Sequence, residues 1–122
     1  MEIENMQTQK LCKIRDVYRA ISEFEIDFQK KFDLCLNEGM MLCSLNENKY
    51  SSSQIAEMLG LTNSNASKVI KSVENKGLVK RILGKEDKRQ MYFVITPAGK
   101  QKLESIKCED FNIPKLLMPI VE

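Results

Sequence analysis

The first quarter of the chain repeats apolar residues at helical spacing. The stripe that follows alternating three- and four-residue steps consists of Ile14, Val17, Ile21, Phe24 and Phe28, widened by Leu11 and Tyr18. This spacing predicts one long helix over residues 3–30. Because its apolar face is wider than a single short neighbour would cover, two interpretations stay open: ordinary core packing, or pairing with a second copy of the chain.

A second helix is predicted from Asn37 to about Asn46. The Asn37 side chain can accept hydrogen bonds from the free amides of a first helical turn, so this residue is the expected N-cap. The buried stripe of this helix is expected to be Met41, Leu42 and Leu45.

Residues 51–77 are typical of a helix-turn-helix. Ser51-Ser52-Ser53-Gln54 is a capping box that opens a short helix, and Gly60 ends it. Thr62 is expected to cap a second helix, which Gly77 stops. The inward residues of that second helix are Ala66, Val69, Ile70 and Val73. Two helices joined by a short turn that contains Gly are the arrangement found in helix-turn-helix proteins.

The outward face of that second helix carries the candidate chemistry. Its residues are all hydrogen-bond donors and none is acidic: Asn63, Ser64, Asn65, Ser67, Lys68 and Lys71. Asn can pair bidentately with adenine, Ser can contact base edges or phosphates, and Lys can bind guanine or neutralise phosphate. A solvent-facing helix usually mixes charge signs, whereas here the first acid is Glu74, beyond the third turn. The pattern therefore favours a recognition helix in a nucleic-acid groove.

Residues 78–83 and 90–95 are rich in β-branched and aromatic residues and are expected to form a hairpin. The second strand alternates as a half-buried strand does, at Met91, Phe93 and Ile95. The link at 84–89 is too charged to be buried and too long for a two-residue turn. We therefore expect it to project as a wing beside the recognition helix.

Thr96-Pro97 is expected to open a further helix with Leu103 and Ile106 turned inward. Beyond Lys107 the helical signal stops. The tail is apolar again at Leu116, Leu117, Met118, Ile120 and Val121. This tail either folds back on the first helix or contributes to an association surface.

Length and composition indicate one globular domain, residues 1–122. The chain is 43% apolar and 30% charged, and we divide it into a dimerisation helix at 3–30, a winged helix-turn-helix at 37–95, and a C-terminal helix and tail at 96–122. The net charge is only +2. Residues 60–102, however, hold ten Lys or Arg and three acids, which is +7, so the remainder carries −5. This basic stretch coincides with the predicted recognition helix and wing.

Enzymatic and membrane functions are not expected. The chain has no histidine, and its cysteines at 12, 35, 43 and 108 form no Cys-x-x-Cys pair. We therefore expect no metal, no cofactor and no catalytic residue. No apolar run approaches the roughly 18 residues of a spanning helix, and Met1-Glu2-Ile3-Glu4 does not resemble a signal peptide. These features favour a cytoplasmic protein with reduced cysteines.

Taken together, these motifs resemble those of the MarR family of bacterial winged-helix transcription regulators. The family's turn between its two DNA-binding helices is similar to Leu59-Gly60-Leu61-Thr62, its Gly-Leu-Val to Gly77-Leu78-Val79, and the Asp-x-Arg core of its wing to Asp87-Lys88-Arg89. The motif that opens the family's next helix is similar to Ile95-Thr96-Pro97-Ala98-Gly99. The resemblance covers roughly residues 10–106.

The resemblance implies a mostly α-helical fold with a small β-hairpin, in which a winged helix-turn-helix domain is flanked by dimerisation helices. It implies a homodimer that acts as a sequence-specific repressor or activator on double-stranded DNA, at a pseudo-palindromic operator. Each recognition helix would enter a major groove and each wing the adjoining minor groove. There Arg89 would insert and Asp87 would orient it through an ion pair, with Lys88 as a further candidate contact.

Other functions stay open. A small ligand bound between the dimerisation helices and the DNA-binding lobe could release the regulator from DNA. Residues that could line its pocket, but that more commonly form plain core, are Tyr18, Phe24, Phe28, Met40 and Met41. One alternative is redox sensing through Cys12, whose basic neighbours could favour a thiolate. Another is a winged-helix protein-interaction module that does not bind DNA.

Overall fold

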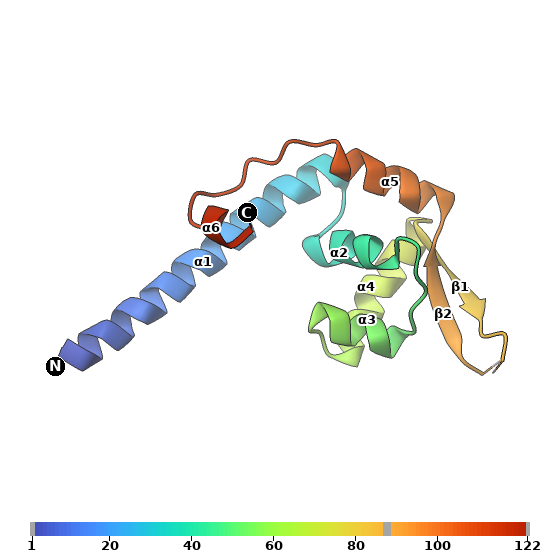
Figure 1. Ribbon diagram of the computed structural model, residues 1–122, viewed down its shortest axis with the longest axis horizontal. Helices are drawn as coiled ribbons and strands as arrows, with labels where there is room; N and C mark the ends of the chain where they lie inside the picture. The colour runs from blue at the N-terminus through green and yellow to red at the C-terminus, as the bar shows by residue number, and fades with distance from the viewer. Residues whose placement is uncertain (1, 87–88, 122) are drawn as a thin grey trace. The chain divides into compact units, whose positions relative to one another are not determined.

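The computed structural model describes residues 2–86 and 89–121, with side chains from residue 6 onward. The elements in chain order are α1 (Glu2–Phe32), α2 (Leu36–Leu45), α3 (Ser52–Leu59), α4 (Asn63–Asn75), β1 (Val79–Leu83), β2 (Met91–Ile95), α5 (Pro97–Lys107) and α6 (Met118–Val121) (Figure 1). They form two compact units, one of Met1–Asp33 with Asp110–Glu122 and one of Leu34–Glu109. The prediction of a mostly helical fold with one antiparallel hairpin is confirmed.

The long helix α1 continues to Phe32, slightly beyond the predicted end at residue 30. The sequence contains no Gly or Pro in this stretch that would break a helix. The helix stops where Asp33 takes a left-handed backbone conformation, with φ 56°. Lys30 and Lys31 lie in the last turn, where their charges complement the negative end of the helix dipole.

The C-terminal part of α1 packs against the tail of the chain. Phe111 contacts three phenylalanines of α1, with its ring centroid 5.5 Å from that of Phe24, 6.0 Å from that of Phe28 and 6.0 Å from that of Phe32. Aromatic pairs of this kind contribute about 0.5–1.5 kcal/mol each beyond the area they bury. The tail thus folds back on the first helix around Phe111, and Leu117 is buried. The other apolar residues of the tail stay exposed, so an association surface formed by them stays a prediction: Leu116, Met118, Ile120 and Val121.

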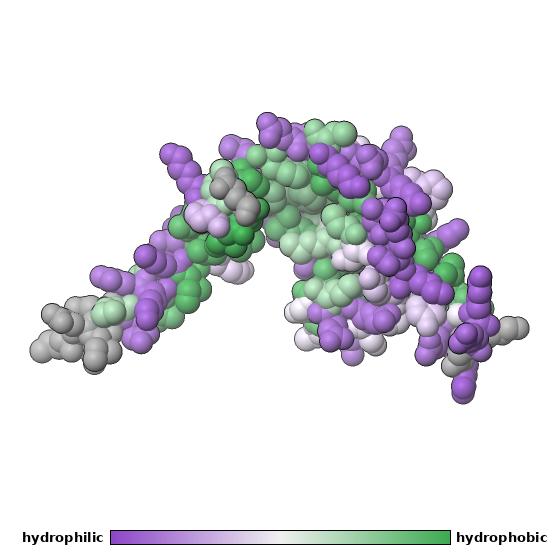
Figure 2. Space-filling view, viewed as in Figure 1, coloured by the Kyte–Doolittle hydropathy of each residue, from purple (hydrophilic) through white to green (hydrophobic). Residues whose placement is uncertain are grey.

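The remaining part of the α1 stripe is exposed. Figure 2 shows hydrophobic residues along one edge of α1 and hydrophilic residues along the other. Leu11, Ile14 and Tyr18 keep 66%, 65% and 71% of their surface accessible, and Ile21 keeps 42%. Packing within the chain therefore accounts only for the part of the stripe around Phe28. A contiguous exposed apolar face, unlike single exposed residues, is typical of an interaction surface.

The second unit is built around α2, α3 and α4, with the hairpin packed on α4 and with α5 against α2 and β2 (Figure 1). Its most deeply buried side chains are Leu34, Met41, Leu42, Leu45, Ile55 and Val73. Leu103 and Ile106 of α5 are buried as predicted. Burying each side chain of this size stabilises the fold by about 1.5–3 kcal/mol relative to exposure. The apolar stripes predicted for these helices thus form the core, except that Val69 of α4 is only half-buried.

Local capping residues start three helices as predicted. Ser51 Oγ accepts a hydrogen bond from Gln54 N at 3.3 Å, and Gln54 Oε1 accepts one from Ser51 N at 2.9 Å. Thr62 accepts from Asn65 N at 3.1 Å at the start of α4, and Thr96 accepts from Gly99 N at 3.0 Å at the start of α5. Each bond satisfies an amide that the first helical turn leaves without a partner.

Glycine ends both helices of the helix-turn-helix. Gly60 and Gly77 have φ 66° and 76°, a left-handed conformation that other residues adopt only at a cost of about 1–2 kcal/mol. The residues that follow them, Leu61 and Leu78, donate their amides back to carbonyls of the last helical turns at 2.9 and 3.2 Å. Both predicted stops are therefore confirmed, and they direct the chain out of α3 and α4.

The predicted N-cap of α2 is wrong. The helix begins at Leu36 with Cys35 as its N-cap, so Asn37 lies inside the first turn. The carboxylate of Glu38 accepts a hydrogen bond from Cys35 N at 2.9 Å. Because Glu38 reaches back to the amide before Leu36, the chain enters the helix earlier than the Asn signal indicates.

The two strands pair antiparallel, with Val79 opposite Ile95 at the base of the hairpin. Tyr50, between α2 and α3, adds a single bridge to β2: its amide donates to Phe93 O at 3.3 Å, and Phe93 N donates to Tyr50 O at 2.8 Å. The sequence does not predict this bridge, since one residue has no alternating pattern. It ties the helix-turn-helix to the hairpin.

At Gly99, helix α5 lies close to the backbone of Leu78, just beyond the end of α4. A Cβ at Gly99 would collide with the backbone carbonyl of Leu78, so this position requires glycine. Thr96 donates from its amide to Leu78 O at 3.0 Å and from its hydroxyl to Gly77 O at 2.7 Å. The start of α5 is therefore fixed against the turn that follows α4.

Candidate nucleic-acid interface

The predicted recognition helix, α4, presents its polar face to solvent. All six predicted contact residues of this helix are exposed: Asn63, Ser64, Asn65, Ser67, Lys68 and Lys71. The opposite face is held in the core by Ala66, Ile70 and Val73, which are 1%, 2% and 0% exposed. The fold thus leaves open the face that the sequence pattern indicates. Contact of these residues with DNA stays a prediction.

The wing loop connects β1 to β2. Gly84 N donates to Gln90 O at 2.8 Å and closes the hairpin before the loop. The exposed loop residues in the described part are Lys85, Glu86 and Arg89. The predicted residues Asp87 and Lys88 lie outside the described residues, so the ion pair between Asp87 and Arg89 stays a prediction.

An ion pair joins α4 to the hairpin. Arg81 on β1 donates from Nε and from one terminal nitrogen to the two carboxylate oxygens of Glu74, at 2.8 and 2.9 Å. The guanidinium also lies over the ring of Phe93 on β2, 5.4 Å from its centroid. The hydrogen bonds to Glu74 raise the pKa of Arg81. Because two parallel bonds fix direction as well as distance, Arg81 orients the hairpin relative to α4.

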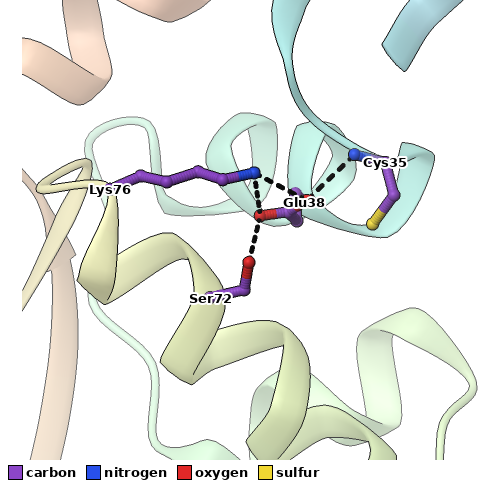
Figure 3. Close-up of polar contacts among 4 residues, drawn as sticks. All are labelled: Cys35, Glu38, Ser72 and Lys76. Atoms are coloured by element: carbon purple, nitrogen blue, oxygen red, sulfur yellow. Dashed lines mark hydrogen bonds and ion pairs between the residues drawn. The ribbon is translucent and has the colours of Figure 1, made fainter.

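A second polar anchor holds α4 from the side of α2 (Figure 3). Glu38 is 5% exposed, and among the described residues it is the one charged residue that is buried. Its carboxylate accepts from Ser72 Oγ at 2.9 Å and from Lys76 Nζ at 3.0 and 3.2 Å. With the bond from Cys35 N, each carboxylate oxygen receives two donors. The buried charge is therefore fully hydrogen-bonded.

The electrostatics of Glu38 follow from this geometry. Burial alone would raise the carboxyl pKa, because a low-dielectric environment disfavours the charged form. The hydrogen bonds from Cys35 N, Lys76 and Ser72 outweigh burial and hold the pKa of Glu38 below its ordinary value. Sequence reasoning missed this anchor. Ser72 and Lys76 lie 34 and 38 residues after Glu38 in the sequence, so no local pattern connects them to it.

The positive charge of residues 60–102 is carried mainly by exposed side chains. The exposed basic residues of this stretch, apart from Lys76 and Arg81, which are paired with Glu38 and Glu74, are Lys68, Lys71, Lys80, Lys85, Arg89 and Lys100. Of its acids, Glu74 is paired with Arg81, and Glu86 is exposed in the wing loop. A surface of this kind attracts phosphate and raises the rate of association with nucleic acid.

The residues predicted to line a ligand pocket lie in different environments. Met41 is fully buried in the second unit, and Phe24 and Phe28 contact Phe111 in the first. The remaining two, Tyr18 and Met40, are 71% and 51% exposed. These positions are those of core and surface residues, and a small-molecule effector stays a prediction from the family resemblance.

The cysteines are free thiols. Cys12 is half-buried on α1, and burial raises the pKa of the Cys35 thiol, which disfavours a reactive thiolate there. Within residues 6–86 and 89–121, no three His, Cys, Asp or Glu side chains gather closely enough to hold a metal ion. Among the described helices, none combines the length and apolar character needed to cross a bilayer.

Comparison with known proteins supports the resemblance to the MarR family that the sequence motifs indicate. Residues 36–91 match the model of the MarR family. The HTH-type transcriptional regulator YwaE of Bacillus subtilis (strain 168) is 22% identical over 111 residues, which are 87% of this chain and 65% of YwaE. The transcriptional regulator BldR from Sulfolobus solfataricus superposes with a TM-score of 0.71 at 26% identity, covering 98% of this chain and 95% of BldR. The S. aureus MepR–DNA complex matches in fold, with a TM-score of 0.68 at 20% identity over 77% of this chain and 71% of MepR.

The helix-turn-helix of α3 and α4, followed by a two-stranded hairpin, defines a winged-helix protein. The family model matches from the first residue of α2 to the first residue of β2. Residues 36–91 match the MarR family, and the resemblance noted from the motifs is confirmed.

Proposed function

We propose that this chain is a sequence-specific DNA-binding transcriptional regulator. In this proposal α4 enters the major groove and the wing reaches the adjoining minor groove. The observation that carries it is the outward face of α4, which offers six exposed hydrogen-bond donors and no acid. An α-helix fits the major groove of B-DNA, where base edges present acceptors and donors in distinct patterns. MepR, a protein of similar fold, has a structure in complex with DNA.

Two kinds of contact are proposed for this face. Asn63, Asn65 and Ser67 have short side chains that make directional bonds, and they would select the base sequence. Lys68 and Lys71 are flexible point charges, and they would bind phosphates of any sequence. Arg89, at the exposed wing, would enter the minor groove, whose negative potential is strongest in narrow A/T-rich stretches.

The acting species is proposed to be a homodimer that pairs through α1. The exposed apolar surface from Leu11 to Ile21 supports this, because a second copy would remove it from water. Twofold symmetry would place two recognition helices at two half-sites, which requires a pseudo-palindromic operator. Release from DNA by a small ligand belongs to the same proposal and rests on the family resemblance. A cytoplasmic location is proposed from the pattern of cysteines.

The comparisons favour neither of the other two functions considered, redox sensing at Cys12 and protein interaction without DNA. A selection from random duplexes with the purified protein separates DNA recognition from protein interaction without DNA, and rapid labelling of Cys12 by a thiol reagent in the native protein would indicate redox sensing. We expect enrichment of one twofold-symmetric sequence. Binding to the enriched duplex should weaken with salt at a log-log slope of about −0.9 per phosphate contacted. A protein that enriches no sequence under reducing conditions would contradict the proposal.

A further inference from the structure

The Glu38 anchor consists of Glu38 and its partners Cys35, Ser72 and Lys76. It is not part of the proposed DNA-contacting surface, because Glu38 is buried and none of its partners is among the six predicted contact residues of α4. Burying a carboxylate is costly, and apolar residues of similar volume often stabilise a core equally well or better. The anchor therefore calls for an explanation other than stability. What a hydrogen-bonded carboxylate adds over an apolar contact is direction.

The anchor holds the C-terminal end of α4, through Ser72 in its last turn and through Lys76, the C-cap residue that follows it. Ser72 and Lys76 are four residues apart and so lie on one row of the helix. The Ser72 hydroxyl is short and meets Glu38 Oε2 at 2.9 Å, so a rotation of α4 by one residue, about 100°, would carry it out of reach. Apolar contacts tolerate such a rotation far better than hydrogen bonds do, because a hydrogen bond requires a particular distance and angle. The other end of the same carboxylate is fixed by Cys35 N at the start of α2.

The row that Glu38 holds is also the row of a predicted base-reading residue. Asn65 and Ser72 are seven residues apart, which is two helical turns within about 20°. The angle at which Ser72 is held therefore fixes the angle at which Asn65 leaves the helix. Asn65 is exposed, whereas Ser72 is half-buried toward α2. Glu38 thus influences the orientation of Asn65 at the proposed interface through the rigid backbone of α4.

We propose that Glu38 is a positioning residue for DNA recognition, which sets the rotation of α4 through Ser72 and Lys76 and thereby the sequence preference of the outward face. This inference rests on the proposed DNA-binding function. Loss of the anchor should affect base contacts, which need exact angles, more than phosphate contacts, which do not.

The test compares two affinities for each variant, one for the selected duplex and one for a scrambled duplex of the same length, by fluorescence anisotropy. For Glu38→Gln we expect the ratio of the two affinities to fall at least about fivefold, a loss of the size that one misplaced base contact produces. Affinity for the scrambled duplex should change less than about twofold. Ser72→Ala removes a single bond of the anchor and should lower the ratio in the same direction by less.

Leu103→Val serves as the matched control, because it destabilises the core from α5 without touching the anchor. All variants are measured at a temperature where circular dichroism shows them folded. The double variant Glu38→Gln with Ser72→Ala should have the ratio of Glu38→Gln alone, since Ser72 acts through Glu38. If Glu38→Gln does not fold, Ser72→Ala against Leu103→Val decides the question.

An unchanged ratio in Ser72→Ala and Glu38→Gln would overturn the inference, and so would an equal loss in Leu103→Val, because the anchor would then act only through stability. If wild-type protein fails to distinguish the two duplexes, the proposed function falls and this inference with it. A wild type that discriminates, beside anchor variants that discriminate equally well, would refute the positioning role alone.

Discussion

Replacing Glu38 with Gln removes the buried charge while keeping the size of the side chain. The Gln carbonyl can still accept from Cys35 N, but Lys76 loses its ion pair with Glu38 and the pattern of acceptors around Ser72 changes. We therefore expect the second unit to be destabilised at neutral pH, with its fold intact.

The magnitude follows from the exposure of the partners. Removing one member of a fully buried ion pair costs about 3–5 kcal/mol, because the other charge is stranded. The Lys76 side chain is 32% exposed, however, so water would solvate its ammonium when Glu38 is neutral. We expect the free energy of unfolding to fall by about 2 kcal/mol, the value of one or two bonds to a charged group. In a unit of this size that corresponds to a Tm lower by about 10 °C.

The effect should depend on pH with a definite sign. The folded state holds the pKa of Glu38 below its ordinary value, so the stabilising contribution is complete above the unfolded pKa of about 4.3. It is lost as the pH falls through the folded pKa, where the carboxylate becomes protonated. Gln does not titrate. The difference in stability between wild type and Glu38→Gln should therefore be constant near neutral pH and shrink in acid.

Urea unfolding followed by circular dichroism measures this difference at each pH. Glu104→Gln is the control, because the Glu104 carboxylate is exposed and its pair with Lys107 spans 3.5 Å at the surface. Such pairs contribute about 0–1 kcal/mol, so the control should remain close to wild type. A Glu38→Gln protein as stable as wild type at pH 7, or a difference that does not shrink in acid, would show that the anchor does not hold the fold as described.

Further predictions concern other parts of the chain. Gly99→Ala should destabilise the fold, although Gly→Ala in a helix ordinarily stabilises by about 0.5–1 kcal/mol, because the new methyl group meets the Leu78 carbonyl; thermal melting decides the sign. Wild type should sediment as a dimer at micromolar concentration and Ile21→Asp as a monomer, and a dimeric variant would contradict pairing through α1. Arg89→Ala should leave the Tm nearly unchanged but weaken binding to sites with A/T-rich flanks. Asp87→Ala should weaken binding too, whereas tighter binding would show that Asp87 does not orient Arg89.

Most helix boundaries could be predicted because their signals are local. A cap such as Ser51 or Thr62 bonds an amide three residues away, so the pattern is contained in a few letters of sequence. The error at Asn37 arose where two local signals compete. A good capping residue lies beside Glu38, and the structure follows the carboxylate.

The features that could not be predicted all join distant parts of the chain. The bridge between Tyr50 and Phe93 joins backbone groups that are far apart in the sequence, and a single bridging residue has no periodic pattern that would predict it. The pairing of Glu38 with Lys76 appears only when α2 and α4 are packed together. Sequence periodicity shows which face of α4 is open, because helical geometry fixes it, but it does not show what holds that face at its angle.

The central claim is that the outward face of α4 reads base sequence, and the most direct test compares Asn65→Ala with Lys71→Ala. Affinity is measured for the selected duplex and a scrambled one over a range of salt concentrations. Asn65→Ala should cost roughly 1–3 kcal/mol on the selected duplex and little on the scrambled one. Lys71→Ala should weaken both about equally and lower the salt slope by about one unit. Equal losses on both duplexes for Asn65→Ala would contradict the claim that this face recognises sequence.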